Sequence, residues 1–374
     1  NQAITAQKTS TEDNKVSVSF DHQLAAGNTL RIAKLGGYIS SRNHPKEALE
    51  QQAIQVLSEA KKLSFDALYQ EQKAAWNEVW KSGDIAIEGD VKAQQAIRFN
   101  IFQLNQTYTG EDAGLNIGPK GFTGEKYGGS TYWDTEAYCI PFYMATKNQK
   151  VARNLLTYRY LQLDRAIENA EKLGFKKGAA LYPMVTMNGE ECHNEWEITF
   201  EEIHRNSAIA FAIFNYTRYT GDHSYIPEMG LEVLIGIARF WAQRASYSSA
   251  KQQYVILGVT GPNEYENNVN NNWYTNYSAQ WCLNYTAQII KELRDNSPEE
   301  AARIEAKTAF ESAELEQWEK IATLMYLPED NNLNVVLQQD GFLDKEMIKV
   351  ADLDPKERPI NQHWSWDRIL RSPY

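Results

Sequence analysis

The chain has 374 residues, with 38 Lys and Arg against 49 Asp and Glu, so its net charge at pH 7 is −11. This acidic balance argues against nucleic acid or an anionic membrane as the main partner, because both attract a basic face. Mean hydropathy is −0.57, and no run of about 18 apolar residues predicts a membrane-spanning helix. Three widely spaced cysteines fit neither a disulfide framework nor a Cys-pair metal site, so we expect a cytoplasmic protein.

The chain begins with a strand-like pattern. Residues 16–20 and 30–33, on either side of the turn 25–29, carry apolar side chains in the alternation typical of strands. Two or three short strands do not make a stable sheet. We therefore expect the last strands of a β domain here.

Helical periodicity follows over residues 44–81, with Ser64 as an expected N-cap and Gly83 as an expected stop. Further helices are predicted near 91–108, 134–145, 149–173, 201–219, 224–245, 274–293, 298–307 and 312–325. Long polar loops separate these helices. Their alternation fits either a helical toroid with its loops at one mouth or a helical solenoid.

The loop 121–136 places Trp133 and Asp134 at the start of a helix. A sugar site needs a flat aromatic face for C–H groups and a carboxylate that accepts hydrogen bonds from hydroxyl groups. The alternative is that Asp134 caps the helix and Trp133 belongs to the core. The glycines of this loop do not have the spacing of a phosphate-binding loop.

The loop 181–206 contains six glutamates, interleaved with histidine and tryptophan. A solvated surface explains the glutamates at the ends of this run, Glu202 among them. It does not explain Trp196, which stands between Glu195 and Glu197. This arrangement favours a polar sugar subsite.

Two other readings of the same loop concern charge pairs and metals. Glu201 and Arg205 have the i, i+4 spacing of a helix ion pair. His193, Glu197 and His204 are potential metal ligands, but their spacing is not that of the HExxH motif. We therefore predict no metal site.

The loop 258–276 places Glu264 after a turn forced by Gly261 and Pro262, with Trp273 beyond it. A glutamate held by a stiff turn beside aromatic residues has its pKa raised by desolvation, as a general acid requires. The alternative is an ordinary turn carboxylate on the surface.

The segment 358–374 carries a fourth cluster of aromatic and polar residues, with Trp364 and Trp366 at its centre. The alternative is that both tryptophans pack beneath the wall of the toroid. Taken together, the four loops indicate a cavity that binds neutral sugars through hydrogen bonds and stacking faces.

Three of these segments resemble a known family: TYWDTEAYCIPFY, LYPMVTMNGEECHNEWEITFEEIHRN and GVTGPNEYENNVNNNWYTN look like signature blocks of glycoside hydrolase family 65. The likeness runs from about Gly114 to the C-terminus and is strongest to members that phosphorolyse maltose. It implies a mainly α fold, in which an (α/α) six-fold barrel, incomplete at its C-terminal end, follows a helical linker and the last strands of a β-sandwich. The implied ranges are 1–43 for the strands, 44–88 for the linker and 89–374 for the barrel.

The resemblance also implies the activity, which is inverting phosphorolysis of maltose to β-glucose 1-phosphate and glucose. Inorganic phosphate is then the co-substrate, with no metal or organic cofactor, and a homodimer is expected. The implied catalytic acid is Glu264. The implied sugar-binding residues are Trp133, Asp134, His193, Glu195, Trp196 and Glu197.

Three alternatives stay open at this point. The family includes inverting α-glucoside hydrolases and phosphorylases for kojibiose, trehalose and nigerose. Its phosphate-binding loop is expected beyond Tyr374, so no residue of this chain is assigned to phosphate. A non-catalytic carbohydrate-binding fragment is the alternative of a different class.

Overall fold

The computed structural model describes residues 8–119, 121, 128–192 and 196–373, and for Trp196 only the backbone. Contacts group the chain into two units, Asn1–Lys81 and Ser82–Tyr374. The finer division into 1–43, 44–88 and 89–374 stays a prediction.

The first unit begins with a β-hairpin. Strands β1 (Lys8–Glu12) and β2 (Lys15–Ser19) pair antiparallel, with Glu12 opposite Lys15 across a two-residue turn. The strand predicted over 30–33 is wrong, since residues 20–40 contain no strand. An extended segment needs a neighbour to satisfy its backbone groups, and the described part of this unit offers it none.

Helices α1 (Leu49–Lys62) and α2 (Phe65–Gly83) follow the hairpin. The backbone N–H of Ala67 donates to Ser64 Oγ at 3.1 Å, so Ser64 caps the start of α2 as predicted. Helix α2 ends at Gly83, also as predicted.

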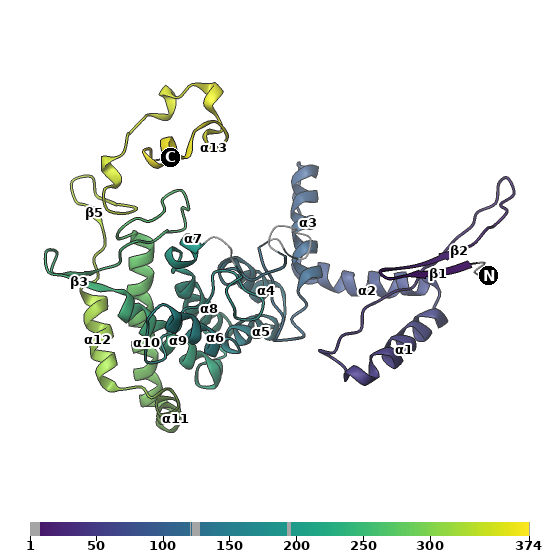
Figure 1. Cartoon of the computed structure of the whole chain (residues 1–374), viewed down its shortest axis with the longest axis horizontal. Helices are drawn as coiled ribbons and strands as arrows, with labels where there is room; N and C mark the ends of the chain where they lie inside the picture. Colours follow the sequence, from purple (N-terminus) through teal and green to yellow (C-terminus); the bar gives the residue numbers. More distant parts are fainter. Residues whose placement is uncertain (1–7, 120, 122–127, 193–195, 374) are drawn as a thin grey trace. The chain divides into compact units, whose positions relative to one another are not determined.

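The second unit consists of packed helices separated by long loops (Figure 1). The helices are α3 (Val91–Thr107), α4 (Ile140–Thr146), α5 (Gln149–Tyr160), α6 (Leu163–Lys172), α7 (Trp196–Glu201), α8 (Arg205–Thr220), α9 (Leu231–Arg244), α10 (Trp273–Asn296), α11 (Pro298–Thr308), α12 (Ser312–Thr323), α13 (Ile360–His363) and α14 (Trp366–Leu370). Two short antiparallel hairpins accompany them, β3 (Ser246–Ser248) with β4 (Gln253–Val255) and β5 (Glu329–Asp330) with β6 (Val335–Val336). The predicted mainly helical fold is confirmed. Within the described ranges, no helix has the length and apolar character needed to cross a membrane.

Two predicted helices are divided in the structure. The helix expected over 149–173 breaks between α5 and α6, where the Arg159 carbonyl accepts hydrogen bonds from the Gln162 N–H at 3.1 Å and the Tyr182 hydroxyl at 3.1 Å. These bonds tighten the last turn of α5, and the helix ends there. The helix expected over 201–219 begins only at Arg205, and the shorter α7 precedes it.

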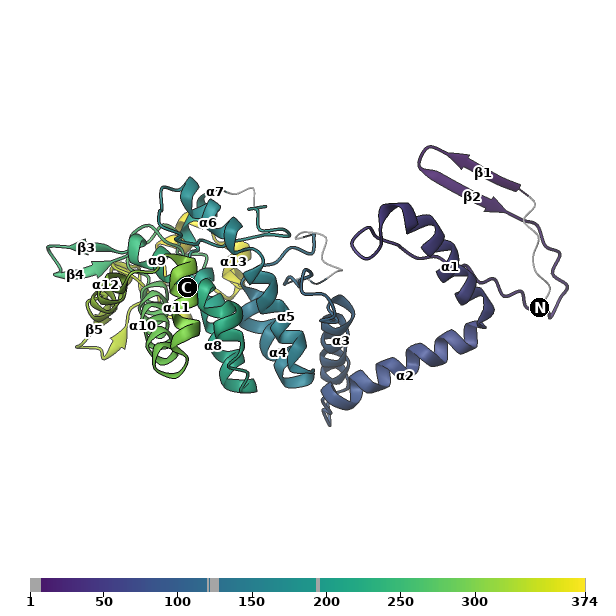
Figure 2. The same ribbon diagram turned by 90° about the horizontal axis from the view of Figure 1, so that it is seen from below.

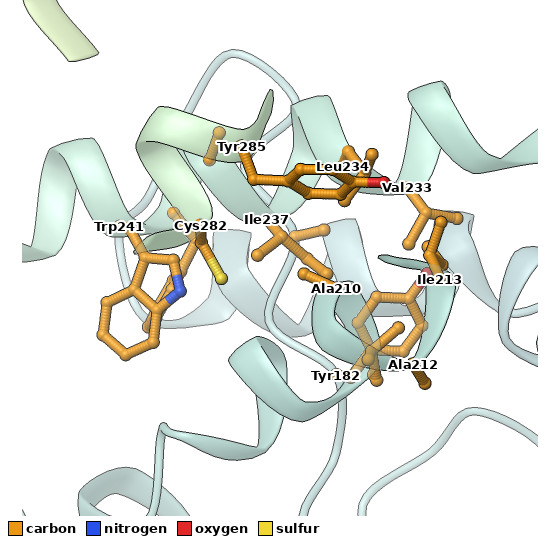
Figure 3. Close-up of a cluster of buried hydrophobic side chains, with 14 of the residues drawn as sticks. Tyr182, Ala210, Ala212, Ile213, Val233, Leu234, Ile237, Trp241, Cys282 and Tyr285 are labelled. Carbon is orange, nitrogen blue, oxygen red and sulfur yellow. The ribbon is translucent and has the colours of Figure 1, made fainter. Parts of the chain in front are cut away.

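Helix α9 forms the centre of the core. Every residue over 231–242 is buried, which is typical of a helix surrounded on all sides. Helices α8, α10, α11 and α12 all contact it, and α8, α9 and α10 lie side by side in both views (Figures 1 and 2). Figure 3 shows Ile213 of α8, Ile237 and Trp241 of α9, and Cys282 of α10 gathered in this core.

A buried ion pair fixes the segment that carries Trp133 and Asp134. Arg159 Nε lies 2.6 Å from Glu136 Oε1, and a terminal nitrogen of the same guanidinium lies 2.9 Å from Glu136 Oε2. Both side chains are buried. Because Arg159 belongs to α5 and Glu136 to a π-helical turn, Thr135–Cys139, this pair anchors the turn that precedes α4.

This pair predicts a large loss of stability in the variant Arg159→Met, because the Glu136 carboxylate stays buried without its partner. We expect the free energy of unfolding, measured by urea denaturation, to fall by about 3–5 kcal/mol. Lys291→Met is the control, since the Lys291–Glu319 pair is exposed and such pairs contribute about 0–1 kcal/mol. If the free energy of unfolding falls by the same small amount in both variants, the Arg159–Glu136 pair does not anchor the turn.

Candidate active site

Three aromatic rings from three separate loops meet at the helix starts. The Trp133 and His204 ring centroids lie 5.1 Å apart, with the rings 82° from parallel. His204 and Tyr274 lie 5.6 Å apart at 80°. Trp133 precedes α4, His204 immediately precedes α8, and Tyr274 lies in the first turn of α10. The N-terminal ends of these helices, and the three loops singled out in the sequence, therefore converge.

His204 takes part in this cluster as a neutral ring. It is fully buried. The pKa of His204 is lowered to about 3, mainly by burial and in part by the neighbouring Arg205 cation. At neutral pH this imidazole supports Trp133 by packing and does not act as an acid.

Hydrogen bonds tie the three loops together. Thr131 and Thr186 form an antiparallel bridge, with N···O distances of 2.7 and 3.1 Å, that joins the first loop to the second. The carboxylate of Glu201 joins the second loop to the third, because its Oε2 accepts from the Thr260 hydroxyl at 2.6 Å and from the Asn268 N–H at 2.9 Å. Both ends of the loop that carries Glu264 are thereby held to the end of α7.

The predicted ion pair between Glu201 and Arg205 is wrong. Glu201 ends α7, and Arg205 begins α8, so the two do not share one helix. The Arg205 guanidinium instead donates to the carbonyls of Tyr182 at 2.6 Å and Glu202 at 2.9 Å.

The asparagine-rich part of the third loop has a structural role. Asn271 Oδ1 accepts from the Ile256 N–H at 3.1 Å, and Asn272 caps α10 through the Thr275 N–H at 3.0 Å. A Cβ atom at Gly261 would lie 2.4 Å from Asn272 Nδ2, so only glycine allows this close packing. These contacts keep the turn before Glu264 in one conformation.

Two cavities border this turn. The polar cavity has a volume of about 460 Å³, and the aromatic cavity has a volume of about 580 Å³. The polar cavity is lined by Glu197, Ile198, Glu201, Thr260, Glu264, Asn267, Asn268 and Trp366. The aromatic cavity is lined mainly by Trp133, Tyr138, Phe211, Tyr274, Tyr277 and Trp281, with Pro262 at its edge. Hydrogen-bonding groups and stacking faces thus lie on either side of one turn, which suits a sugar.

The structure brings four of the predicted site residues into this region. Glu264 and Glu197 line the polar cavity, and Trp133 lines the aromatic cavity. Asp134 is half-buried and makes no capping hydrogen bond with the following turn, so the alternative role as a helix cap is wrong. Glu264 is exposed, so its side chain is not desolvated as the sequence predicted.

The other predicted residues of the second loop are not placed. His193 and Glu195 lie outside the described residues, and only the backbone of Trp196 is described, as the first residue of α7. Within the described ranges, no group of three or more His, Cys, Asp or Glu side chains is arranged to hold a metal ion.

The C-terminal segment contributes one tryptophan to the site and one to the core. Trp366 lines the polar cavity and lies against Tyr265, with ring centroids 5.3 Å apart. Trp364 is buried in a small cluster with Leu353 and Ile369. The alternative in which both tryptophans pack in the interior is therefore right for Trp364 and wrong for Trp366.

The residue that sequence reasoning missed is Glu202. Its side chain is only 1% exposed. The pKa of Glu202 is raised to about 8, mainly by burial and in part by the neighbouring Glu264 and Asp134 carboxyl groups, against the effect of the Arg205 cation. The interpretation of Glu202 as part of a solvated surface is wrong.

A signal for this burial exists in the sequence. Glu201 and Glu202 form a doublet directly before the buried Ile203 and His204. Adjacent side chains point in different directions, so a doublet at such a boundary directs one carboxyl group inward.

Comparison with known proteins identifies the family. Residues 98–374 match the family model described as the glycosyl hydrolase family 65 central catalytic domain, and residues 1–79 match the N-terminal domain of the same family. The resemblance seen in the sequence is confirmed.

Individual relatives include several disaccharide phosphorylases. The chain is 52% identical to maltose phosphorylase of Bacillus subtilis over 90% of this chain and 43% of that protein. It is 35% identical to α,α-trehalose phosphorylase of Thermoanaerobacter brockii over 97% of this chain and 46% of that protein. A solved structure described provisionally as a kojibiose phosphorylase from the human microbiome has a TM-score of 0.80 and 32% identity. It covers 88% of this chain and 45% of its own. The chain thus spans less than half the length of these relatives, and its helical unit has the family's (α/α) barrel architecture.

The burial of Glu202 predicts that stability depends on pH. A carboxyl group with a raised pKa in the folded state stabilises the fold fully below its unfolded pKa of about 4.3, and this contribution is lost as pH rises through the folded value. The free energy of unfolding of the wild type, relative to Glu202→Gln, should therefore fall between about pH 4.3 and pH 8. The expected slope is on the order of 1 kcal/mol per pH unit.

Urea denaturation across this pH range measures the slope. Glu190→Gln is the matched control, because Glu190 belongs to the same loop and is exposed. The difference in the free energy of unfolding between Glu190→Gln and the wild type should not change with pH. If the corresponding difference for Glu202→Gln is also independent of pH, the structure does not bury a protonated carboxyl group at Glu202.

Proposed function

We propose that this chain, which belongs to glycoside hydrolase family 65, carries the acid catalyst and the glucosyl subsite of an inverting disaccharide phosphorylase. The proposed substrate is maltose, and the products are β-glucose 1-phosphate and glucose. The observation that carries the proposal is Glu264, held on a rigid turn between a polar and an aromatic cavity. The likeness to the Bacillus subtilis maltose phosphorylase supports maltose over kojibiose or trehalose.

Glu264 acts as the general acid in this proposal. Its carboxyl proton passes to the glycosidic oxygen as the bond from that oxygen to the anomeric carbon breaks, and the departing glucose keeps the electron pair. An oxygen of inorganic phosphate bonds to the anomeric carbon from the opposite face, which inverts its configuration. The proton lost by the phosphate group restores the acid, so the reaction balances.

The neighbouring side chains position the glucosyl ring. Trp133 supplies a stacking face in the aromatic cavity, and the half-buried Asp134 supplies a carboxylate for sugar hydroxyl groups. Glu197 also lines the polar cavity. Holding the reacting atoms in place supplies much of the rate. We include His193, Glu195 and Trp196 in this subsite on the family resemblance alone.

Phosphate as the nucleophile makes a second catalytic carboxylate unnecessary. The likeness to disaccharide phosphorylases favours phosphorolysis over inverting hydrolysis. No metal or organic cofactor enters the proposed reaction.

We also propose a cytoplasmic location and a homodimer. Cys139, Cys192 and Cys282 are all free thiols, which suits a reducing compartment. The homodimer rests on the family resemblance.

The variant Glu264→Gln tests the acid role. It keeps the side chain's size and removes its transferable proton, so kcat for maltose phosphorolysis should fall by about 100-fold or more, with a small change in KM. Glu329→Gln, at an exposed position, serves as the control and should retain wild-type kinetics. A Glu264→Gln enzyme with more than about a tenth of the wild-type kcat would show that another group is the acid.

The reaction itself is tested with the full-length protein and maltose, with and without inorganic phosphate, by resolving the product anomers by NMR. The proposal predicts β-glucose 1-phosphate that forms only with phosphate. Free glucose formed at the same rate without phosphate would identify a hydrolase.

A further inference from the structure

The polar cavity has an aromatic face, which Trp366 supplies. The other described residues that line this cavity carry carboxylate, amide, hydroxyl or aliphatic side chains. Trp366 is 50% exposed, and its ring centroid lies 5.3 Å from that of Tyr265, the residue that directly follows Glu264. A stacking face among hydrogen-bonding groups suits a ligand that has both C–H and hydroxyl groups, such as a sugar ring.

A largely buried ion pair links Trp366 to the turn that carries Glu264. Glu266, two positions after Glu264, pairs with Lys345. The Lys345 ammonium group also donates to the carbonyl of Leu370, the last residue of α14, at 2.6 Å. A cation at this end of a helix satisfies a carbonyl that has no partner within the helix. Because Trp366 is the first residue of α14, the pair connects the position of its ring to that of the acidic turn.

We propose that Trp366 is the stacking face for the departing glucose of maltose, and that the Lys345–Glu266 pair is a positioning device that holds this face beside Glu264. The inference rests on the proposed function, in which Glu264 protonates the glycosidic oxygen and Trp133 holds the glucosyl ring. That oxygen joins the two rings of maltose, so one ring lies on either side of the acid. The aromatic cavity takes the glucosyl ring, and the polar cavity takes the departing glucose.

The size and lining of the polar cavity fit this role. Its volume of about 460 Å³ lies within the range of about 300–1,000 Å³ that is typical of small-molecule sites. A flat aromatic face fixes the plane of a bound sugar, and the surrounding polar groups fix its rotation within that plane. Together they determine which hydroxyl oxygen of the departing sugar lies at Glu264. Trp366 is thereby a specificity-determining residue for the linkage that is cleaved.

The test compares maltose with α-glucosyl fluoride as substrates of the full-length protein. The glucosyl ring is the same in both, but fluoride as the departing group places no sugar in the polar cavity. Trp366→Ala should lower kcat/KM for maltose by about 10-fold or more, the usual effect of truncating an aromatic anchor. It should leave kcat/KM for α-glucosyl fluoride close to that of the wild type. Trp366→Phe keeps a smaller stacking face, so its kcat/KM for maltose should lie between those of Trp366→Ala and the wild type.

Two further variants complete the experiment. Tyr247→Ala is the matched control, because Tyr247 is 48% exposed and lies on β3, outside the lining of both cavities. It should retain wild-type kinetics with both substrates. The double variant Lys345→Met with Glu266→Gln removes the ion pair without leaving an unpaired buried charge. It should lower kcat/KM for maltose more than for α-glucosyl fluoride, because Trp366 is no longer held beside the acid.

Two results for Trp366→Ala would overturn the proposal. An equal loss with both substrates would show that Trp366 supports the fold or the glucosyl ring, and an unchanged kcat/KM for maltose would show that it does not contact the departing sugar. An equal loss with both substrates in the double variant would overturn the positioning role of the Lys345–Glu266 pair.

Failure of the proposed function gives a different result. The comparison between the two substrates depends on the departing group, so it applies equally if water takes the place of phosphate as the nucleophile. Free glucose formed from maltose at the same rate without phosphate would overturn phosphorolysis, and the selective effect of Trp366→Ala on maltose would still decide whether this residue binds the departing glucose.

Discussion

The Glu201 carboxylate ties the loop that carries Glu264 to the end of α7, and the arrangement of the site depends on this contact. Its Oε2 atom accepts hydrogen bonds from the Thr260 hydroxyl group and from the Asn268 N–H. Glu264 lies between these two residues in the chain and lines the polar cavity, so these bonds set its position relative to α7. The neighbouring Glu202 is buried at the junction between α7 and α8.

The same constraint explains the position of the site in the fold. Helices α4, α8 and α10 present their N-terminal ends to one another, and the rings of Trp133, His204 and Tyr274 pack at that point. Helices α8 and α10 both pack against the buried helix α9. The loops gain their rigidity from buried polar contacts, such as the Arg159–Glu136 pair, because a loop at a cavity mouth has little apolar surface to bury.

The sequence was sufficient to predict the mainly helical fold and the three loops that converge, because helices and turns have local signals in periodicity and turn residues. It failed where the outcome depended on contacts between distant segments. Glu202 was predicted to lie on a solvated surface, but it is buried where α7 meets α8. Likewise, the partner of Glu201 is Thr260 of another loop, and not the nearby Arg205. The break between α5 and α6 depends on the hydroxyl group of Tyr182, which no helix propensity encodes.

The most direct test of this account is a measurement of the protonation state of Glu202 itself. Glutamate labelled with ¹³C at the side-chain carboxyl carbon allows each carboxyl group to be followed by NMR across a pH titration, and comparison with Glu202→Gln assigns the resonance. The account predicts that Glu202 is protonated at neutral pH and ionises near pH 8, and that Glu264→Gln lowers this pH, because the opposing charge has been removed. Ionisation of Glu202 near pH 4.3, the value for an isolated glutamate, would contradict it.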